Sequence, residues 1–122
     1  MDRSKTGKLS HLKGQVAEDQ IAAAYVRSGF DIVDRRFKTC DGEIDIVARH
    51  KDKFYFIEVK SSKTFDGAVA QITPKQQKRI QDCALAYLAQ KAGHLDVDCR
   101  FDAALVDGSG RIKVMPGALL AA

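Results

Sequence analysis

The first regular pattern in the chain has the spacing of an amphipathic helix. From about Gly14 onward the apolar positions recur on one helical face, and they comprise Ile21 and Tyr25 with Ala17 and Ala24 beside them. Gly29 is placed to end this helix. Glu18 lies at the edge of the apolar face, where it either leans toward the core for a chemical reason or reaches solvent as an edge residue.

Three strands are predicted next, at residues 30–37, 42–48 and 54–60. The last two are rich in β-branched and aromatic side chains, which favour strands. The segment 49–53 between them is short and polar, so we expect these two strands to form an antiparallel hairpin. Residues 61–72 are expected to form a loop.

A second helix is predicted to begin after Thr73. Threonine is a common N-cap, Pro74 suits the first helical position, and Gln76 stands where it completes a capping box with the threonine. The apolar stripe of this helix comprises Ile80, Ala84, Tyr87 and Leu88, and Gly93 can terminate it. Two further strands are predicted at 101–106 and 111–115. The order of helix, three strands, helix and two strands predicts an α/β fold with a mixed central sheet flanked by helices.

The composition is that of one soluble globular domain. The chain has 122 residues, of which 45% are hydrophobic and 30% charged, and this size suits a single core. We expect one domain over residues 14–116 and a tail over 117–122. No stretch approaches the roughly 20 apolar residues that a membrane span needs, and no secretory signal is recognisable. The three cysteines lack a CxxC spacing, which predicts reduced thiols and a cytoplasmic location.

Basic residues are concentrated at the start of the chain. The formal net charge is +4, and Arg3, Lys5, Lys8 and Lys13 stand there against Asp2 alone. We expect residues 1–13 to form a flexible basic arm. Such an arm either solubilises the protein or contacts a polyanion such as nucleic acid, and the sequence leaves both interpretations open.

Acidic side chains interrupt the second and third predicted strands, which otherwise look buried on both faces. Strand alternation places Glu43, Asp45 and Val47 on one face of the second strand, and Ile44 and Ile46 on the other. On the third strand it places Phe54, Phe56, Glu58 and Lys60 opposite Tyr55, Ile57 and Val59. A buried carboxylate must be paired, bound to a metal or neutralised.

Asp45, Glu58 and Lys60 form a set that is suited to phosphodiester hydrolysis. If the hairpin brings the two carboxylates side by side, they repel each other, and Mg²⁺ or Mn²⁺ is the natural ion to relieve the repulsion. Lys60 would then orient or help to deprotonate an attacking water and stabilise charge on a phosphate. The alternative is a cross-strand salt bridge between a glutamate and a lysine on a solvated face.

Four short motifs resemble those of the YraN family of small bacterial proteins. They are Gly14-x-x-x-Glu18, Gly42-Glu43-Ile44-Asp45, Ile57-Glu58-Val59-Lys60 and Thr73-Pro74-Lys75-Gln76, with Phe101-Asp102 on a later strand. The likeness runs from about Gly14 to Met115. That family is similar to the restriction-endonuclease-like PD-(D/E)xK fold, which includes archaeal Holliday-junction resolvases. The resemblance implies a restriction-endonuclease-like core with the order α-β-β-β-α-β.

The resemblance also implies a role for each residue of the site. Asp45 would be the aspartate of the motif, Glu58 its second acid and Lys60 its lysine. Glu18 would be the extra acid that the first helix supplies to the metal in some members, through a metal-bound water or directly, and the backbone carbonyl of Val59 would complete the metal shell. This sequence departs from the family pattern in two places. Ile44 rather than proline precedes Asp45, and two serines follow Lys60 where a basic residue is expected.

Other charged residues are candidates for supporting roles. Lys63 is the candidate substitute for the missing basic residue. Lys75, Lys78 and Arg79 begin the second helix, where the backbone favours anions, and they either contact nucleic acid or form a solvated helix end. Glu43 either lies in an outer shell of the metal site or pairs with Arg36 or Lys38.

Three functions follow from these observations. The leading hypothesis is a metal-dependent endonuclease acting on DNA, with branched or damaged DNA as candidate substrates and a homodimer expected on symmetric junctions. The alternative is a non-catalytic nucleic-acid-binding module that keeps the fold and the acid cluster. A third possibility is a structural protein whose acids form salt bridges with Arg35, Arg36 and Lys60. Cation-dependent DNA cleavage distinguishes the first from the second, and the absence of specific metal binding would favour the third.

Overall fold

The structure, a computed structural model, describes residues 3–93 and 97–119, with side chains from residue 14 onward. Its elements are α1 (Arg3–Arg27), β1 (Asp31–Thr39), β2 (Gly42–His50), β3 (Lys53–Ser61), α2 (Phe65–Ala70), α3 (Pro74–Tyr87), the π-helical turn η1 (Leu88–Ala92), β4 (Cys99–Val106) and β5 (Ile112–Met115). None of the helices in this described part has the length and the apolar run that crossing a membrane requires.

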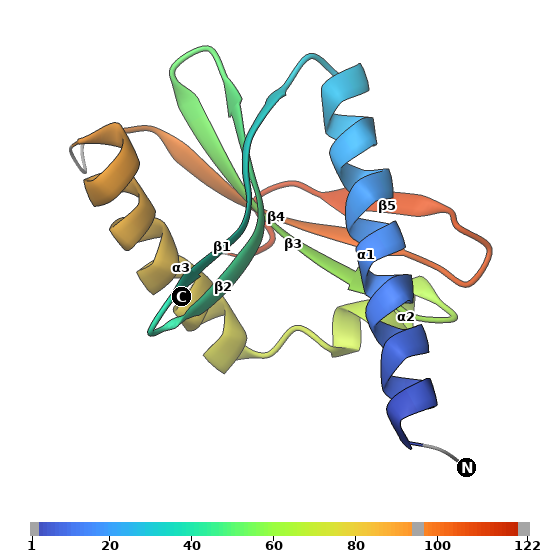
Figure 1. The fold of residues 1–122 in the computed structure, drawn as a ribbon. Helices are drawn as coiled ribbons and strands as arrows, with labels where there is room; N and C mark the ends of the chain where they lie inside the picture. Colours follow the sequence, from blue (N-terminus) through green and yellow to red (C-terminus); the bar gives the residue numbers. More distant parts are fainter. Residues whose placement is uncertain (1–2, 94–96, 120–122) are drawn as a thin grey trace.

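The strands form one mixed sheet in the order β1-β2-β3-β4-β5. Neighbouring strands are antiparallel except β3 and β4, which run parallel and are joined by the crossover through α2 and α3. Helix α1 covers one face of the sheet and α3 the other (Figure 1). The predicted α/β class, with a mixed central sheet flanked by helices, is confirmed.

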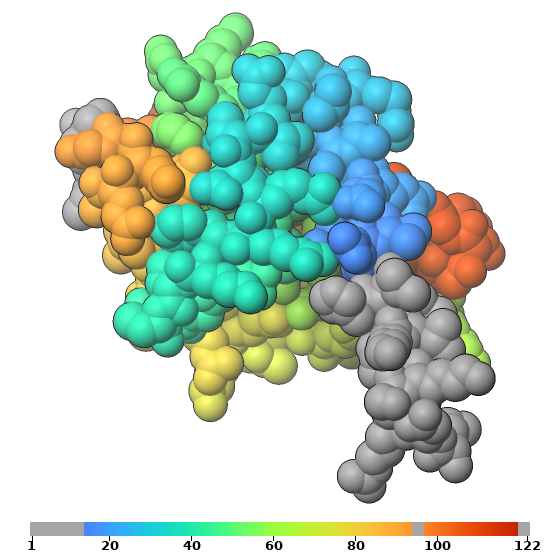
Figure 2. Space-filling view, in the orientation of Figure 1, coloured from blue at the N-terminus to red at the C-terminus, as the bar shows by residue number. Residues whose placement is uncertain are grey.

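Each face of the sheet has its own hydrophobic core. On one face, α1 buries Ile21 and Tyr25 against Ile46 and Ile57 of the central strands. On the other face, the predicted apolar stripe of α3 and η1 is fully buried against a cluster that includes Phe56, and the stripe comprises Ile80, Ala84, Tyr87 and Leu88. Side chains of β1 and β2 fill the surface between α1 and α3 (Figure 2). The sheet is therefore sandwiched as a middle layer, because each helix removes apolar area from water on one of its faces.

The predicted helix ends are largely confirmed. Gly29, with a φ of 94°, follows the end of α1, and Gly93, with a φ of 81°, ends the turn η1. At the start of α3, Thr73 Oγ1 accepts a hydrogen bond from the Gln76 N–H at 3.1 Å. The capping box stays incomplete, because the Gln76 side chain reaches the sheet instead of the Thr73 backbone.

Three segments differ from the sequence prediction. Helix α1 already begins at Arg3 rather than near Gly14, because extending an existing helix costs far less than nucleating one. The predicted loop 61–72 contains the short helix α2, whose N-cap Thr64 accepts a hydrogen bond from the Gly67 N–H at 3.0 Å. In the expected tail, Leu119 is buried, and its N–H donates to the Phe101 carbonyl. The expected contact of residues 1–13 with nucleic acid stays a prediction.

Candidate active site

Asp45 lies where the hairpin of β2 and β3 stops pairing. The register of these strands runs from His50 opposite Lys53 to Ile46 opposite Ile57, and it ends there. At the next residue of β2, a side chain replaces the backbone as hydrogen-bond acceptor, since Asp45 Oδ2 accepts a hydrogen bond from the Val59 N–H at 2.8 Å. A carboxylate thus replaces the backbone acceptor that the diverging strand no longer offers.

The ladder between β1 and β2 is also irregular at Asp45. Pairing passes from Arg35 opposite Ile46 to Phe37 opposite Ile44, with no pair recorded between Arg36 and Asp45. Arg36 has a φ of 54°, a left-handed conformation that costs an arginine roughly 1–3 kcal/mol. Such strain in a strand is typical of a functional site.

This irregularity corrects the predicted faces of β2. Alternation placed Ile44 and Ile46 together, but Ile44 packs in the core under α3 and Ile46 in the core under α1. The chain changes face at Asp45, because the ladders on both sides of it are interrupted. A strict period of two cannot foresee such a local twist.

Strand β3 alternates as predicted and presents Glu58 toward α3. Phe54 and Phe56 belong to the core under α3, whereas Tyr55, Ile57 and Val59 belong to the core under α1. The Glu58 side chain is only 6% exposed. Its Oε1 receives the Lys60 ammonium at 3.1 Å and the Gln76 amide at 3.2 Å. Both donors meet the same oxygen, and Oε2 receives neither of them.

Burial and mutual repulsion make the two carboxyl groups reluctant to ionise together. Burial is the main cause that raises the pKa of Asp45 from 3.8 to about 8, and the neighbouring Glu58 raises it further. Burial also raises the pKa of Glu58, while the Lys60 ammonium acts in the opposite direction. The proton of the pair is therefore favoured on Asp45, because Lys60 stabilises the ionised form of Glu58.

Glu18 lies near this pair but has partners of its own. Its Oε2 lies 3.1 Å from Arg36 Nε and 3.8 Å from Arg35 Nη2. Its negative charge is close enough to raise the pKa of Asp45. Among the residues with described side chains, no group of three histidine, cysteine, aspartate or glutamate side chains is arranged to hold a metal ion.

The chemistry of Asp45 and Glu58 nevertheless fits a hard divalent cation. Mg²⁺ is usually bound through only one or two carboxylates and keeps several of its waters. The half-buried Asp45 and the buried Glu58 meet that requirement, and the oxygen of the Gln76 amide lies buried beside Glu58 without a hydrogen-bond partner. An unpaired buried acceptor costs roughly 1–3 kcal/mol. The residues present thus fit a cation site that draws further oxygen ligands from water.

The position of Glu43 does not match the pairings considered for it. Arg36 pairs with Glu18, and Lys38 is the backbone neighbour of Glu43 across the ladder. No ion pair of Glu43 is found within the described part of the chain, although its charge raises the pKa of Glu58. Glu43 therefore contributes to the negative field of the site without contacting a cationic side chain there.

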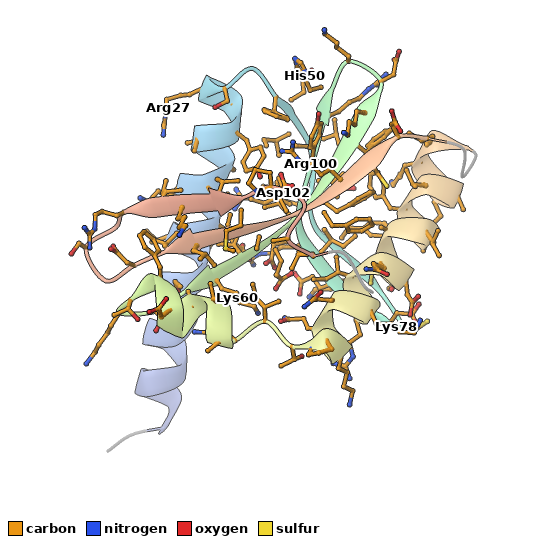
Figure 3. All side chains as sticks on the ribbon, turned by 180° about the vertical axis from the view of Figure 1, so that it is seen from behind. Arg27, His50, Lys60, Lys78, Arg100 and Asp102 are labelled. Atoms are coloured by element: carbon orange, nitrogen blue, oxygen red, sulfur yellow. The ribbon has the colours of Figure 1, made fainter. Side chains whose placement is uncertain are left out.

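The candidate phosphate contacts lie around the same end of the sheet. Lys75, Lys78 and Arg79 are exposed on the first two turns of α3, and Lys78 pairs with Asp82 at 3.4 Å. Lys63 lines a cavity of about 670 Å³ together with Ser61 and Ser62. Figure 3 shows Lys60 and Lys78 at the end of the molecule opposite to Arg27 and His50. Their binding of nucleic acid stays a prediction.

Gln76 is the site residue that the sequence analysis missed. It was interpreted only as part of a helix cap, but its side chain contacts Glu58. A signal was available, because Gln76 precedes Ile80 and Ala84 at intervals of four residues and therefore lies on the sheet-facing stripe. No comparable signal marks the left-handed backbone of Arg36.

A family model described as "Uncharacterised protein family UPF0102" matches residues 17–106 of the chain. This protein belongs to the UPF0102 family. The YraN family, which the motifs resemble, is this family, so the predicted membership is confirmed. The matched segment runs from α1 to the last residue of β4 and contains Glu18, Asp45, Glu58, Lys60 and Gln76.

Similar proteins occur in several bacteria. A UPF0102 protein of Ruegeria pomeroyi is 38% identical over 112 residues, which are 92% of this chain and 91% of that protein. One from Cereibacter sphaeroides is 40% identical over 95% of this chain and 99% of its own length. One from a Bradyrhizobium species is 44% identical over 76% of this chain and 68% of its own length.

Proposed function

We propose that this protein is a divalent-cation-dependent endonuclease that hydrolyses phosphodiester bonds in DNA, with branched or damaged DNA as candidate substrates. The observation that carries the proposal is the half-buried Asp45 beside the buried Glu58. No cationic side chain pairs with Asp45 in the described part of the chain. A protein that uses its acids only for salt bridges would have paired this one, because a buried carboxylate without a cation costs free energy.

Asp45 and Glu58 are the proposed ligands of Mg²⁺ or Mn²⁺, with the Val59 carbonyl as a further oxygen. The bound cation would supply Lewis acidity to the phosphate and lower the pKa of a water. Asp45 must give up its proton before it can serve as a ligand, since its pKa is about 8. Its hydrogen bond to the Val59 N–H fixes the carboxylate in place meanwhile.

Lys60 is the proposed catalytic partner of the acids. Its ammonium group lies 3.1 Å from Glu58 Oε1 and is largely shielded from solvent. From this position it can orient the attacking water and stabilise the negative charge that grows on the phosphate oxygens. Glu58 in turn holds the ammonium in a fixed place.

Basic residues around the site support a polyanionic substrate. Lys75, Lys78 and Arg79 stand at the start of α3, where the positive end of the helix dipole also favours phosphate. Lys63 follows the end of β3 and lines the cavity there with Ser61 and Ser62. If the substrate is a symmetric DNA junction, we expect the protein to act as a homodimer. We also expect a cytoplasmic location, where the protein would have access to DNA.

A non-catalytic nucleic-acid-binding module is the second candidate. The salt bridges of Glu58 with Lys60 and of Glu18 with Arg36 favour it, because they neutralise two of the acids without a metal. Such a module would bind DNA through the same basic residues. Its affinity would fall with salt by about 0.9 in log K for each phosphate neutralised.

Cleavage assays on linear, nicked, flapped and four-way DNA with Mg²⁺ or Mn²⁺ test the proposal. We expect at least one DNA form to be cut, and we expect Asp45→Asn or Lys60→Ala to reduce the rate by at least about 100-fold. Asp52→Asn is the matched control, since Asp52 is an exposed acid in the turn between β2 and β3. DNA that is bound but stays intact with every cation would support the binding module instead.

A further inference from the structure

The two ends of the Gln76 amide have different surroundings. Nε2 donates to Glu58 Oε1 at 3.2 Å, whereas Oε1 is buried and has no hydrogen-bond partner. Among the described side chains, this is the only buried nitrogen or oxygen atom without a partner. Buried polar groups in proteins are nearly always hydrogen-bonded, so the exception calls for a donor that the described side chains do not supply.

Turning the amide over does not remove the problem. Its oxygen would then face the Glu58 carboxylate, and its NH₂ group would have no acceptor. The Lys60 ammonium, which could serve as a donor, is directed to Glu58 Oε1 at 3.1 Å. In this arrangement the ammonium contacts Glu58 and is not a hydrogen-bond partner of Gln76 Oε1.

The backbone of Gln76 is held firmly in place. Its N–H donates to Thr73 Oγ1 at 3.1 Å, and Pro74 fixes the first turn of α3. Four residues further on, Ile80 is buried in the core against the sheet. The unpartnered oxygen is thus held beside Glu58 by a capped helix end and a packed core.

We propose that Gln76 Oε1 accepts a hydrogen bond from a water in the hydration shell of the cation that Asp45 and Glu58 bind. The inference rests on the proposed function, in which that cation is Mg²⁺ or Mn²⁺. Such ions keep several waters in proteins, and these waters need acceptors. Gln76 is then a positioning residue, which fixes Glu58 with its nitrogen and a water with its oxygen.

Replacing Gln76 by methionine separates this role from a structural one. Methionine has a similar length but offers neither end of the amide, and Gln77→Met is the matched control on the neighbouring half-buried residue. We expect Gln76→Met to raise the Kd for Mn²⁺, measured by titration calorimetry above pH 8, by at least about tenfold. The melting temperature in EDTA should change little, because the variant loses one hydrogen bond and one unpaired acceptor together.

The possible results distinguish this inference from the proposed function. A role in capping or packing predicts a lower melting temperature in EDTA and an unchanged Kd, and that result would overturn the inference. Gln76→Glu keeps an acceptor oxygen and adds a negative charge, so it should bind Mn²⁺ at least as tightly as the wild type, and loss of binding in this variant also argues against the inference. Wild-type protein that does not bind Mn²⁺ would overturn the cation site itself. Normal binding by both the wild type and Gln76→Met would remove only Gln76 from the site.

Discussion

Two acids that the sheet withdraws from solvent, the buried Asp102 and the half-buried Asp45, have opposite surroundings. Asp102 on β4 is fully buried, and its oxygens accept hydrogen bonds from the Tyr25 hydroxyl at 2.7 Å, the Arg100 guanidinium at 2.7 and 2.9 Å, and the Gly117 N–H at 3.0 Å. Asp45 on β2 accepts one backbone hydrogen bond and faces a second acid.

The difference between them shows how an acid comes to be structural or reactive. Asp102 ties α1, β4 and the C-terminal turn together, and its charge is balanced where it lies (Figure 3). Burial, and after it the negative charge of Glu58, raises the pKa of Asp45 to about 8, so that this acid favours its protonated form near neutral pH. A site that binds a cation leaves the charge and the hydrogen-bonding capacity of its carboxylates partly unmet when the cation is absent. Such sites usually lower the stability of the folded protein.

The largest expected effect comes from removing the satisfied acid. Asp102→Ala leaves Arg100 and the Tyr25 hydroxyl without their acceptor, so the free energy of unfolding should fall by roughly 3–5 kcal/mol. Asp45→Asn keeps an oxygen for the Val59 N–H and removes a repelled charge, so at pH 8 it should be at least as stable as the wild type. Denaturant unfolding of both variants measures the contrast, and equal losses would erase the distinction between the two acids.

The response to a cation should separate the two acids next. Mn²⁺ at about a hundred times its Kd should stabilise the wild-type protein by about 2.7 kcal/mol. Asp45→Asn should lose most of this response, because the ligand charge is gone. Asp102→Asn should keep it relative to its own metal-free baseline. Thermal melts with EDTA and with Mn²⁺ supply the measurement, and a response that Asp45→Asn retains would contradict the site.

The dependence of stability on pH gives a smaller but more specific contrast. The pKa of Asp45 in the folded chain, about 8, lies above its ordinary value of 3.8. The folded state therefore binds more protons than the unfolded state between these values. The stabilisation by protonated Asp45 is complete below about pH 4 and is lost as the pH rises toward 8, by at most about 1.4 kcal/mol per pH unit.

Denaturant unfolding from pH 5 to pH 8.5 tests this dependence. The free energy of unfolding of the wild-type protein should decrease across the range, and that of Asp45→Asn should decrease much less. The decrease that remains in the variant comes from Glu58, whose pKa is also raised by burial. A wild-type protein that gains stability over the same range would show that the carboxylates are already satisfied in the folded chain.

Much of the fold could be predicted from the sequence, because its signals are local. The alternation along β3, the cap at Thr73 and the apolar stripe from Ile80 to Leu88 follow from the periods of strands and helices. The acids at positions 45 and 58 and the lysine at position 60 were recognisable as a set for the same reason, since a hairpin brings its two strands together.

Only the tertiary structure decided which hydrogen-bond and ion-pair partners those residues have. The left-handed backbone of Arg36 distorts β1 opposite Asp45, and the pairing of Glu18 with Arg35 and Arg36 joins α1 to β1. The crossover through α2 and α3 places Gln76 against Glu58. The contacts of Glu18 with Arg36 and of Gln76 with Glu58 each join side chains 18 positions apart in the sequence. Their geometry is set by the packing of two helices on a twisted sheet, which no local period of the sequence encodes.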